Sequence, residues 1–265
     1  MMNIRPEGYR HTADVWEVLY QLKERKIPVI AQVGAIDYAE DKAMWVLAFP
    51  DYPGITGLVP EKETGLPMNL INRFVGMEIK VIIAGLDREN NMVACSRKEV
   101  VEAAAQQLRE QLSVGDIIPV TVKAILMKDN IATLVVDVGG GVLVDIPRSQ
   151  AVIQRSAPLR AQYSIGQTIP AMVASVEPLL VSIRAARPDP WSQADYKRGQ
   201  FISGTVYRIV DGNAFIEPDL TPGVLGLAPL PLLGDVQKGY RVSCKVRYFA
   251  ADQKKLHLYL VNRIM

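Results

Sequence analysis

Hydrophobic and polar residues alternate along this chain in a pattern that returns three times. Each round opens with an alternating run, at Ile27 to Ile36, Ile117 to Ile125 and Phe201 to Ile209. Alternation with a period of two predicts a strand with one buried face. Because the pattern recurs in the same order, it predicts an internal repeat.

Each round then continues with the same landmarks. A glycine stands about midway and precedes a second alternating run, and a short apolar run closes the round. The glycines are Gly76, Gly166 and Gly239, and the closing runs are Met92 to Ser96, Leu179 to Ile183 and Leu256 to Leu260. Five short strands per round fit the five-stranded Greek-key barrel called the OB fold. We therefore predict an all-β chain with linker helices, built from three tandem five-stranded OB-fold barrels.

The segments outside the rounds are helical or rich in proline. Thr12 is expected to cap an amphipathic helix from Ala13 to Lys26, where apolar residues recur at i, i+3, i+4 and i+7. A second helix is expected from Val100 to Leu112. The prolines after Arg187 predict an extended linker, with a helical turn from Ser192 to Tyr196. The predicted parts are an N-terminal helix (1–26), repeat 1 (27–98), a linker helix (99–113), repeat 2 (114–187), a Pro-Trp linker (188–197) and repeat 3 (198–265).

The composition is that of an ordinary globular protein, with 49% hydrophobic and 22% charged residues. No apolar run approaches the roughly 20 residues that span a bilayer, and the first residues lack the apolar core of a secretory signal. Cys95 and Cys244 lie far apart on predicted strands, so we expect buried, reduced thiols rather than a disulfide. These features predict a cytoplasmic protein with no membrane partner.

The net charge of +2 is modest but unevenly distributed. Residues 197–265 hold ten Lys and Arg against five Asp and Glu, a net charge of +5. Residues 115–187 carry +2 and residues 1–98 carry −1. A basic C-terminal module favours a negatively charged partner such as a nucleic acid. A solvated strand face rich in lysine is the alternative explanation.

Two junctions between the rounds carry a resemblance to a known family. The first runs from Ala94 to Gln150, and the second is Asp189-Pro190-Trp191 followed by Tyr196, Gly199 and the strand from Phe201. In order and spacing the chain resembles the inter-repeat sequence of the bacterial ribosomal protein S-one family, and it looks like a short three-repeat relative. The resemblance covers about residues 25–262. It implies a protein that binds single-stranded RNA.

The resemblance also implies where RNA would lie. It would cross the barrel face made by the second and third strands and the loop before the last strand, with bases stacked on aromatic rings and phosphates met by Lys and Arg. Repeat 3 matches this pattern of aromatic and basic residues best. Its expected RNA-binding residues are Phe215, Tyr207, Arg208, Lys245, Arg247, Lys254, Lys255 and His257. A core position for Phe215 and an ordinary surface position for His257 remain the alternatives.

Several positions depart from the family pattern. Gly212 replaces an aromatic residue in repeat 3, and Asp145 replaces the stacking phenylalanine in repeat 2. Pro60 and Pro229 stand where histidines often occur in the family. These departures weaken the expectation of RNA binding, most of all in repeat 2.

Repeats 1 and 2 are therefore expected to make secondary contacts, either with RNA or with another protein. The candidate residues are Arg148, Arg155 and Arg160 in repeat 2, and Trp45 and Phe49 in repeat 1. Asp37, Glu40, Asp41 and Asp51 make repeat 1 acidic around its aromatic residues, which favours protein contact there. A core position is the alternative for Trp45 and Phe49.

The motifs of enzymes are missing from the sequence. His11 and His257 are isolated, and no Cys/His cluster has metal spacing. Neither a Gly-x-Ser-x-Gly elbow nor a Walker-type loop occurs. Gly139-Gly140-Gly141 lies between predicted strands with no helix after it, so a tight turn is expected there rather than a phosphate cradle. We therefore expect a protein that is not an enzyme and has no metal and no cofactor.

The sequence leads to one hypothesis and one rival. The hypothesis is a cytoplasmic protein that binds single-stranded RNA, such as mRNA, with low sequence specificity in translation or mRNA handling. Repeats 1 and 2 would place it on the ribosome or another protein machine. The rival is a non-enzymatic adaptor that docks to the ribosome or RNA polymerase through OB barrels and has largely lost RNA binding.

Overall fold

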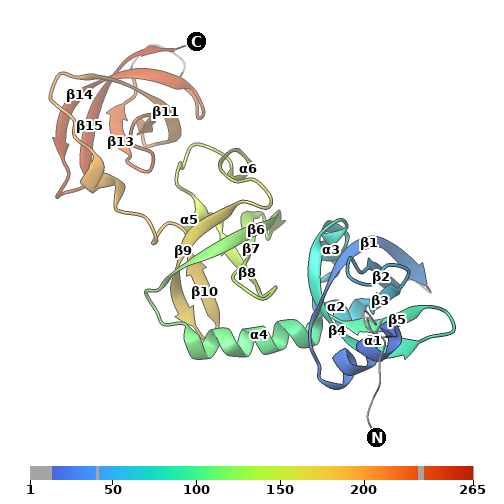
Figure 1. Ribbon diagram of the computed structural model, residues 1–265. Helices are drawn as coiled ribbons and strands as arrows, with labels where there is room; N and C mark the ends of the chain where they lie inside the picture. Colours follow the sequence, from blue (N-terminus) through green and yellow to red (C-terminus); the bar gives the residue numbers. More distant parts are fainter. Residues whose placement is uncertain (1–13, 40–41, 232–235, 265) are drawn as a thin grey trace, which may run out of the picture. The chain divides into compact units, whose positions relative to one another are not determined.

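A computed structural model describes residues 14–39, 42–231 and 236–264 of the chain. Within these ranges the strands form three five-stranded sheets, drawn in blue to cyan, green to yellow and orange to red (Figure 1). The chain packs as two compact units. One unit holds the described residues up to Gln111 together with Asp137–Leu143, and the other holds Leu112–Val136 and the described residues from Val144 onward.

The first sheet is a closed barrel with the strand order β1-β2-β3-β5-β4. All its strand pairs are antiparallel except β3 with β5, which is parallel, and the pairing of β1 with β4 completes the barrel. The strands are β1 (Val29–Ala39), β2 (Lys42–Ala48), β3 (Thr56–Pro60), β4 (Glu78–Asp87) and β5 (Met92–Ser96). Between β3 and β4 the chain forms the short helices α2 (Glu61–Thr64), α3 (Met68–Ile71) and η1 (Asn72–Phe74).

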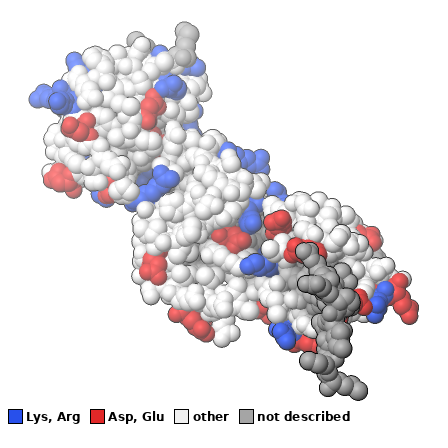
Figure 2. Space-filling view, viewed as in Figure 1, with Lys and Arg blue, Asp and Glu red and all other residues white. Residues whose placement is uncertain are grey.

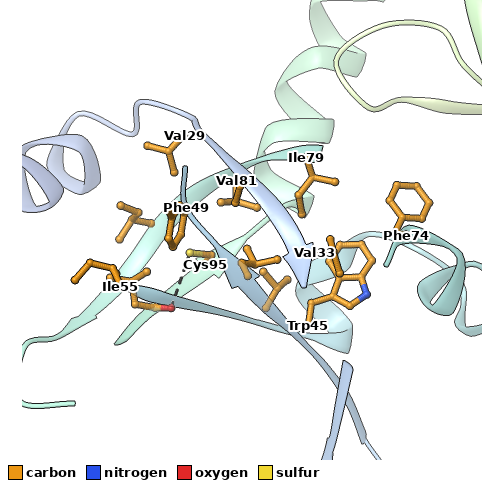
Figure 3. Close-up of a cluster of buried hydrophobic side chains, with 14 of the residues drawn as sticks. Val29, Val33, Trp45, Phe49, Ile55, Phe74, Ile79, Val81 and Cys95 are labelled. Atoms are coloured by element: carbon orange, nitrogen blue, oxygen red, sulfur yellow. Dashed lines mark hydrogen bonds between the residues drawn. The ribbon is translucent and has the colours of Figure 1, made fainter. Parts of the chain in front are cut away.

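Alternating side chains of these strands fill the first barrel (Figure 3). Trp45 on β2 is fully buried, stacks on Phe74 at a centroid distance of 5.6 Å, and donates a hydrogen bond from its Nε1 to the carbonyl of Ile71. Phe49 is buried close to Cys95. Because burial of apolar area is the main driving force for folding, these rings stabilise the barrel.

Helix α1 (Val15–Glu24) packs on the first barrel through Leu19, which is fully buried. Its N-cap is Asp14, whose carboxylate accepts a hydrogen bond from the amide of Trp16. The predicted cap Thr12 lies outside the described residues. A carboxylate at the N-cap also interacts favourably with the helix dipole.

The second sheet has the order β10-β9-β6-β7-β8 and is open between its outer strands. The chain thus contains the three five-stranded sheets that were predicted, and the middle one is a barrel that is not fully closed. The end of β10 instead attaches to α5, because Ser182 Oγ donates to Gln150 Oε1 and Arg184 N donates to the Gln150 carbonyl. The elements are β6 (Ile117–Lys128), β7 (Ile131–Asp137), β8 (Leu143–Pro147), α5 (Arg148–Ala151), α6 (Leu159–Gln162), β9 (Thr168–Val176) and β10 (Leu179–Ser182).

The third sheet is again a closed barrel, with the order β11-β12-β13-β15-β14. Its strands are β11 (Phe201–Val210), β12 (Asn213–Pro218), β13 (Gly226–Pro229), β14 (Arg241–Ala250) and β15 (Lys255–Arg263). The linker before it forms the 3-10 helix η2 (Pro190–Gln193), slightly earlier than the turn predicted over 192–196. Trp191 stacks on Phe249 of β14, and the buried Tyr196 meets the same ring edge-on. The Pro-Trp linker is thus packed onto the third barrel.

The midway glycines have the same backbone conformation and make the same hydrogen bond in all three rounds. Each has a positive φ of 82°, 84° or 89°, and each donates its amide to a carbonyl on the first strand of its round at 2.7–2.8 Å. The pairs are Gly76 with Val33, Gly166 with Val122, and Gly239 with Val206. A residue without a Cβ adopts this backbone conformation at no steric cost. The repeated hydrogen bond is the structural counterpart of the repeated spacing.

Several other expectations are confirmed. Helix α4 (Lys98–Gln111) occupies the predicted linker helix. Cys95 and Cys244 are free and buried, and burial raises the pKa of each thiol to about 12. The triple-glycine segment is a turn, in which Val142 donates to the Gly139 carbonyl. Separately from these expectations, the described ranges contain no helix that is both long and apolar enough to cross a membrane.

Candidate nucleic-acid interface

Five side chains from the five strands of the third barrel form one cross-strand row on its outer surface. Their neighbours on β12, β13 and β15 point inward, because Ala214, Ala228, Leu256 and Leu258 are buried. The row follows the strand register from Arg208 on β11 to Phe215, Leu227, His257 and finally Tyr248 on β14. We call these five residues the outer row. The structure therefore places Phe215 on the surface side of β12, half-buried, and not in the core.

Arg208 and Phe215 act as a pair. The guanidinium carbon of Arg208 lies 4.4 Å from the centroid of the Phe215 ring, so a cation covers one face of the ring. Such a contact is favourable because the ring face is electron-rich. A planar guanidinium can itself stack on a nucleic-acid base while its N–H groups meet phosphate. The pair offers both kinds of contact at one point of the surface.

Strand β15 extends the surface along the barrel. Its outward positions are Lys255, His257 and Tyr259, since Leu256 and Leu258 between them are buried. His257 lies against Tyr248 with a centroid distance of 5.9 Å. The exposed fraction is 45% for Tyr248 and 50% for Tyr259, so both rings have surface available for stacking.

A second group of cations and aromatics continues from Tyr259 onto β14 and β11. Arg247 lies over the Tyr259 ring at 5.5 Å, and Lys245 lies over the Phe201 ring at the same distance. Lys245 is the register partner of both Tyr259 and Phe201. We call Phe201, Lys245, Arg247 and Tyr259 the β14 group. The third barrel is closed, so its outer surface runs around a full circumference. The β14 group covers one arc of this circumference, and Arg208 and Phe215 belong to a second arc. His257 lies where the two arcs meet.

Two predicted residues lie away from this surface. Lys254 sits in the turn before β15, and its ammonium group is paired with the carboxylate of Asp189 in the linker. The hydrogen bond from Lys254 is the largest of the effects that lower the pKa of Asp189. Tyr207 is the extra residue of a bulge in β11, where the register jumps from Val206 to Arg208. Its side chain lines a pocket instead of the outer row.

That pocket also gathers two of the three arginines proposed for repeat 2. Arg148 and Arg155 line it together with Tyr207, and its volume is about 730 Å³. Arg148 donates through Nη2 to the carbonyls of Arg155 and Ala157, so its position is fixed. Arg160 is exposed on α6 and does not line the pocket.

The chain is similar in sequence to small ribosomal subunit proteins named bS1. Small ribosomal subunit protein bS1 of Streptococcus pneumoniae is 26% identical over 229 residues, covering 78% of this chain and 55% of that protein. The bS1 of Staphylococcus saprophyticus is 33% identical over 166 residues, covering 58% of this chain and 40% of that protein. These relatives are bacterial ribosomal proteins. The predicted resemblance to the ribosomal S-one family is confirmed, and the chain spans about half the length of the curated relatives it matches.

The other comparisons add little. No protein-family model matches the chain. Among solved structures, a multidomain protein with nucleic acid binding domains from Streptococcus pneumoniae overlaps 90% of this chain and 74% of that chain, with 12% identity and a TM-score of 0.26. A TM-score this low carries no argument.

The first barrel of this bS1-like chain does not use its large aromatic residues at the surface. Trp45 and Phe49 are at most 3% exposed, so the prediction that they contact RNA or protein is wrong (Figure 3). Both point inward because their parity on β2 and just after it matches that of the core. Tyr38 is 58% exposed and donates its hydroxyl to Asn72 Oδ1. Glu40 and Asp41, part of the predicted acidic surroundings, lie outside the described residues.

The middle sheet lacks an equivalent of the outer row. Asp145 on β8 faces outward between the buried Val144 and Ile146, and its carboxylate pairs with Lys128 of β6. This pair occupies the place where the resemblance expects a stacking phenylalanine. The ion pair with Asp145 offsets the positive charge of Lys128 at this position.

Charge alone does not mark the interface. On the face drawn in Figure 2, Lys and Arg are interspersed with Asp and Glu among large uncharged areas. What distinguishes the third barrel is the pairing of cations with rings. Among the described residues, cation–ring contacts occur at Phe201, Phe215, Tyr240 and Tyr259 of this barrel, and at Phe74 of the first. Across 14–39, 42–231 and 236–264, no group of three His, Cys, Asp or Glu side chains could hold a metal ion.

Proposed function

We propose that this protein binds single-stranded RNA on the outer surface of its third barrel, with low sequence specificity, in translation or mRNA handling. The observation that carries the proposal is the outer row, in which Phe215 is covered by Arg208 and continues through Leu227 to His257 and Tyr248. Every base has a π-face, so stacking on such a surface tolerates any sequence. The bS1 relatives support the proposal because their name places them in the small ribosomal subunit.

The proposal also covers the partners of the chain and its lack of a catalytic role. The RNA is proposed to be mRNA, and the first barrel and the middle sheet are proposed to dock the chain on a ribosome or another protein machine in the cytoplasm. Two observations support separate roles for the three sheets. In the middle sheet Asp145 is paired with Lys128, and in the first barrel Trp45 and Phe49 face inward, so these two sheets present few side chains on which a base could stack. No catalytic role is proposed, in keeping with the ribosomal-protein name of the relatives.

The decisive experiment substitutes the central aromatic residue without changing charge. Phe215→Leu keeps an apolar side chain on β12 but removes the ring. Since stacking contributes roughly 1–3 kcal/mol per base, we expect the Kd for a labelled oligouridylate to rise by about 5- to 150-fold. Fluorescence anisotropy on the full chain at low salt measures it.

The matched control is Tyr38→Leu, which removes an exposed ring from the first barrel. It should leave the Kd within twofold of the unsubstituted chain. If the full chain does not bind RNA at low salt, the RNA proposal fails and the adaptor hypothesis replaces it. Equal losses in Phe215→Leu and Tyr38→Leu would place the interface elsewhere than on the outer row.

A further inference from the structure

A second site lies in the unit formed by the middle sheet and the third barrel. The pocket there has a volume of about 730 Å³, within the range of sites that hold small ligands. Four arginines line it: Arg148, Arg155, Arg184 and Arg187. We call it the arginine pocket. Nothing in the RNA-binding proposal for the outer row uses these four residues together.

The charges of the pocket are not balanced by its own walls. Its lining contains no Asp or Glu, and no ion pair joins any of the four arginines to a carboxylate in the part of the chain that the structure describes. Asp189 stands in the chain between the lining residues Pro188 and Pro190, and its pKa is lowered chiefly by Lys254 and to a smaller extent by Arg184. Like charges brought together in one cavity repel, so an anion in the pocket relieves the repulsion.

Buried Glu217 fixes two walls of the pocket. Its carboxylate is 1% exposed and accepts hydrogen bonds from three backbone amides, those of Arg155, Ser156 and Gly223, at 2.6–2.8 Å. Arg155 and Gly223 both line the pocket. These three hydrogen bonds hold the walls in place, and the single negative charge of Glu217 offsets only part of the charge of the four arginines.

Apart from Ser149 and Gln193, the remaining side chains of the lining are mostly apolar and include one aromatic ring. Ile131, Ile153, Pro188, Pro190 and Pro222 contribute the apolar part, and Tyr207 contributes the ring. The bulge in β11 directs Tyr207 into the pocket while the adjacent Arg208 covers Phe215. The pocket therefore begins one residue away from the outer row.

We propose that the arginine pocket binds one phosphorylated nucleoside, with its phosphate held by the guanidinium groups and its base against the apolar wall and Tyr207. Guanidinium groups bind phosphate with two parallel hydrogen bonds, and the apolar wall and ring beside them suit a base attached to that phosphate better than an acidic peptide. The nucleotide comes either from the bound RNA strand or from free solution. The chemistry of the pocket is the same for both sources, and the site goes beyond the outer row proposed above.

The test uses nuclear magnetic resonance on the full chain, following the backbone amide signals of Arg155 and Gly223. The probes are adenosine 5′-monophosphate, adenosine, inorganic phosphate, octaglutamate and an oligouridylate. We expect saturable shifts with adenosine 5′-monophosphate, and a Kd that rises about tenfold in Arg187→Gln. Arg160→Gln is the matched control, because it removes one exposed arginine that does not line the pocket, and it should change the Kd by less than twofold.

The probes show whether the bound nucleotide belongs to the RNA strand or comes from free solution, and they include the outcomes that would overturn the proposal. Shifts with oligouridylate but not with the free nucleotide assign the pocket to the RNA strand, and shifts with both leave it open to free nucleotides; either result supports the proposal. Equal affinity for inorganic phosphate or octaglutamate overturns it, as does the absence of shifts with every nucleotide probe. In Phe215→Leu the free nucleotide should still bind, so failure of the outer row and failure of the pocket are distinguishable.

Discussion

Tyr207 and Arg208 are adjacent in the sequence but face different surfaces, and this contrast shows where residue-scale prediction reaches its limit. Strict alternation cannot place both residues outward, and the bulge in β11 decides between them. A second bulge lies in β14 between Val246 and Tyr248, and it brings Tyr248 onto the outer row. Bulges change side-chain parity without a clear sequence signal, so Tyr248 was missed.

Other residues could have been found from the sequence. The apolar residues Leu256 and Leu258 predict that Lys255, His257 and Tyr259 share the outward side of β15, which the structure confirms. Tyr259 was missed although this parity was available. Trp45 and Phe49 show the opposite error, since an aromatic residue on a strand belongs to the core whenever its parity matches that of the core.

Two neighbouring lysines give a residue-scale prediction. Lys255 faces outward beside the outer row, whereas the ammonium group of Lys254 is paired with Asp189. We expect Lys255→Gln to raise the Kd for single-stranded RNA by about fivefold at low salt, because one phosphate contact is lost. Lys254→Gln should raise it by less than twofold. Anisotropy titrations of the two variants test this order, and the reverse order would mean that RNA displaces Asp189 from Lys254.

At the scale of elements, the repeat spacing predicts the strands well. The first, fourth and fifth strands of every round occur where alternation indicates them, and β5 spans Met92–Ser96 as expected. The open middle sheet was not predictable, because closure depends on hydrogen bonds between strands far apart in sequence. The strand β10 has the expected apolar run, yet its end is attached to α5 and not to β8.

Arg97 shows how the elements of the first unit are joined. The side chain is 3% exposed, and it donates from Nη1 to the Thr64 carbonyl and from Nη2 to the Gly141 carbonyl, both at 2.8 Å. Burial lowers the pKa of Arg97 to about 10, so the guanidinium remains charged at neutral pH. One buried cation thus connects α2, the start of α4 and the glycine turn.

Removal of this cation should destabilise the first unit. Hydrogen bonds from a charged donor are worth roughly 1.5–3 kcal/mol each. The substitution also removes the free-energy cost of burying a charge, which offsets part of the loss of these hydrogen bonds. For Arg97→Met we expect the free energy of unfolding to fall by about 2 kcal/mol. In a Trp191→Phe background, tryptophan fluorescence during urea unfolding reports only Trp16 and Trp45 of the first unit.

Arg109→Met is the control, because Arg109 lies exposed on the same helix. Its unfolding midpoint should stay within the error of the unsubstituted chain. A stability of Arg97→Met equal to that of the control would mean that the two carbonyls find other donors and that the guanidinium adds nothing to the joint.

At the scale of the whole molecule, the net charge indicates little about where RNA would bind, whereas the distribution of charge along the chain indicates more. The chain carries only +2, yet the excess of basic residues falls in 197–265, where the outer row and the β14 group are found. The sequence could not predict the arginine pocket, because its lining comes from segments between Ile131 and Gly223 that only tertiary structure brings together. Arg148, Arg155 and Tyr207 were candidate residues, but nothing in the sequence joined them.

The two arcs of the third barrel pose a question that salt dependence can answer. A flexible strand that crosses the outer row reaches His257, from which Tyr259 and the β14 group continue along β15. We therefore expect bound RNA to contact both arcs. Each phosphate contact contributes about −0.7 to the slope of log K against log salt for single strands. The double variant Lys245→Gln/Arg247→Gln should then make the slope shallower by about 1.4.

The measurement compares anisotropy titrations of the full chain and this variant over a range of salt concentrations. Lys62→Gln/Lys80→Gln is the matched control, since it removes two exposed charges from the first barrel and should leave the slope unchanged. A slope that does not change in Lys245→Gln/Arg247→Gln would confine the RNA to the arc of Arg208 and Phe215. Because a shallower slope reports fewer released counterions and not a lost fold, the result measures the length of the RNA path on the barrel.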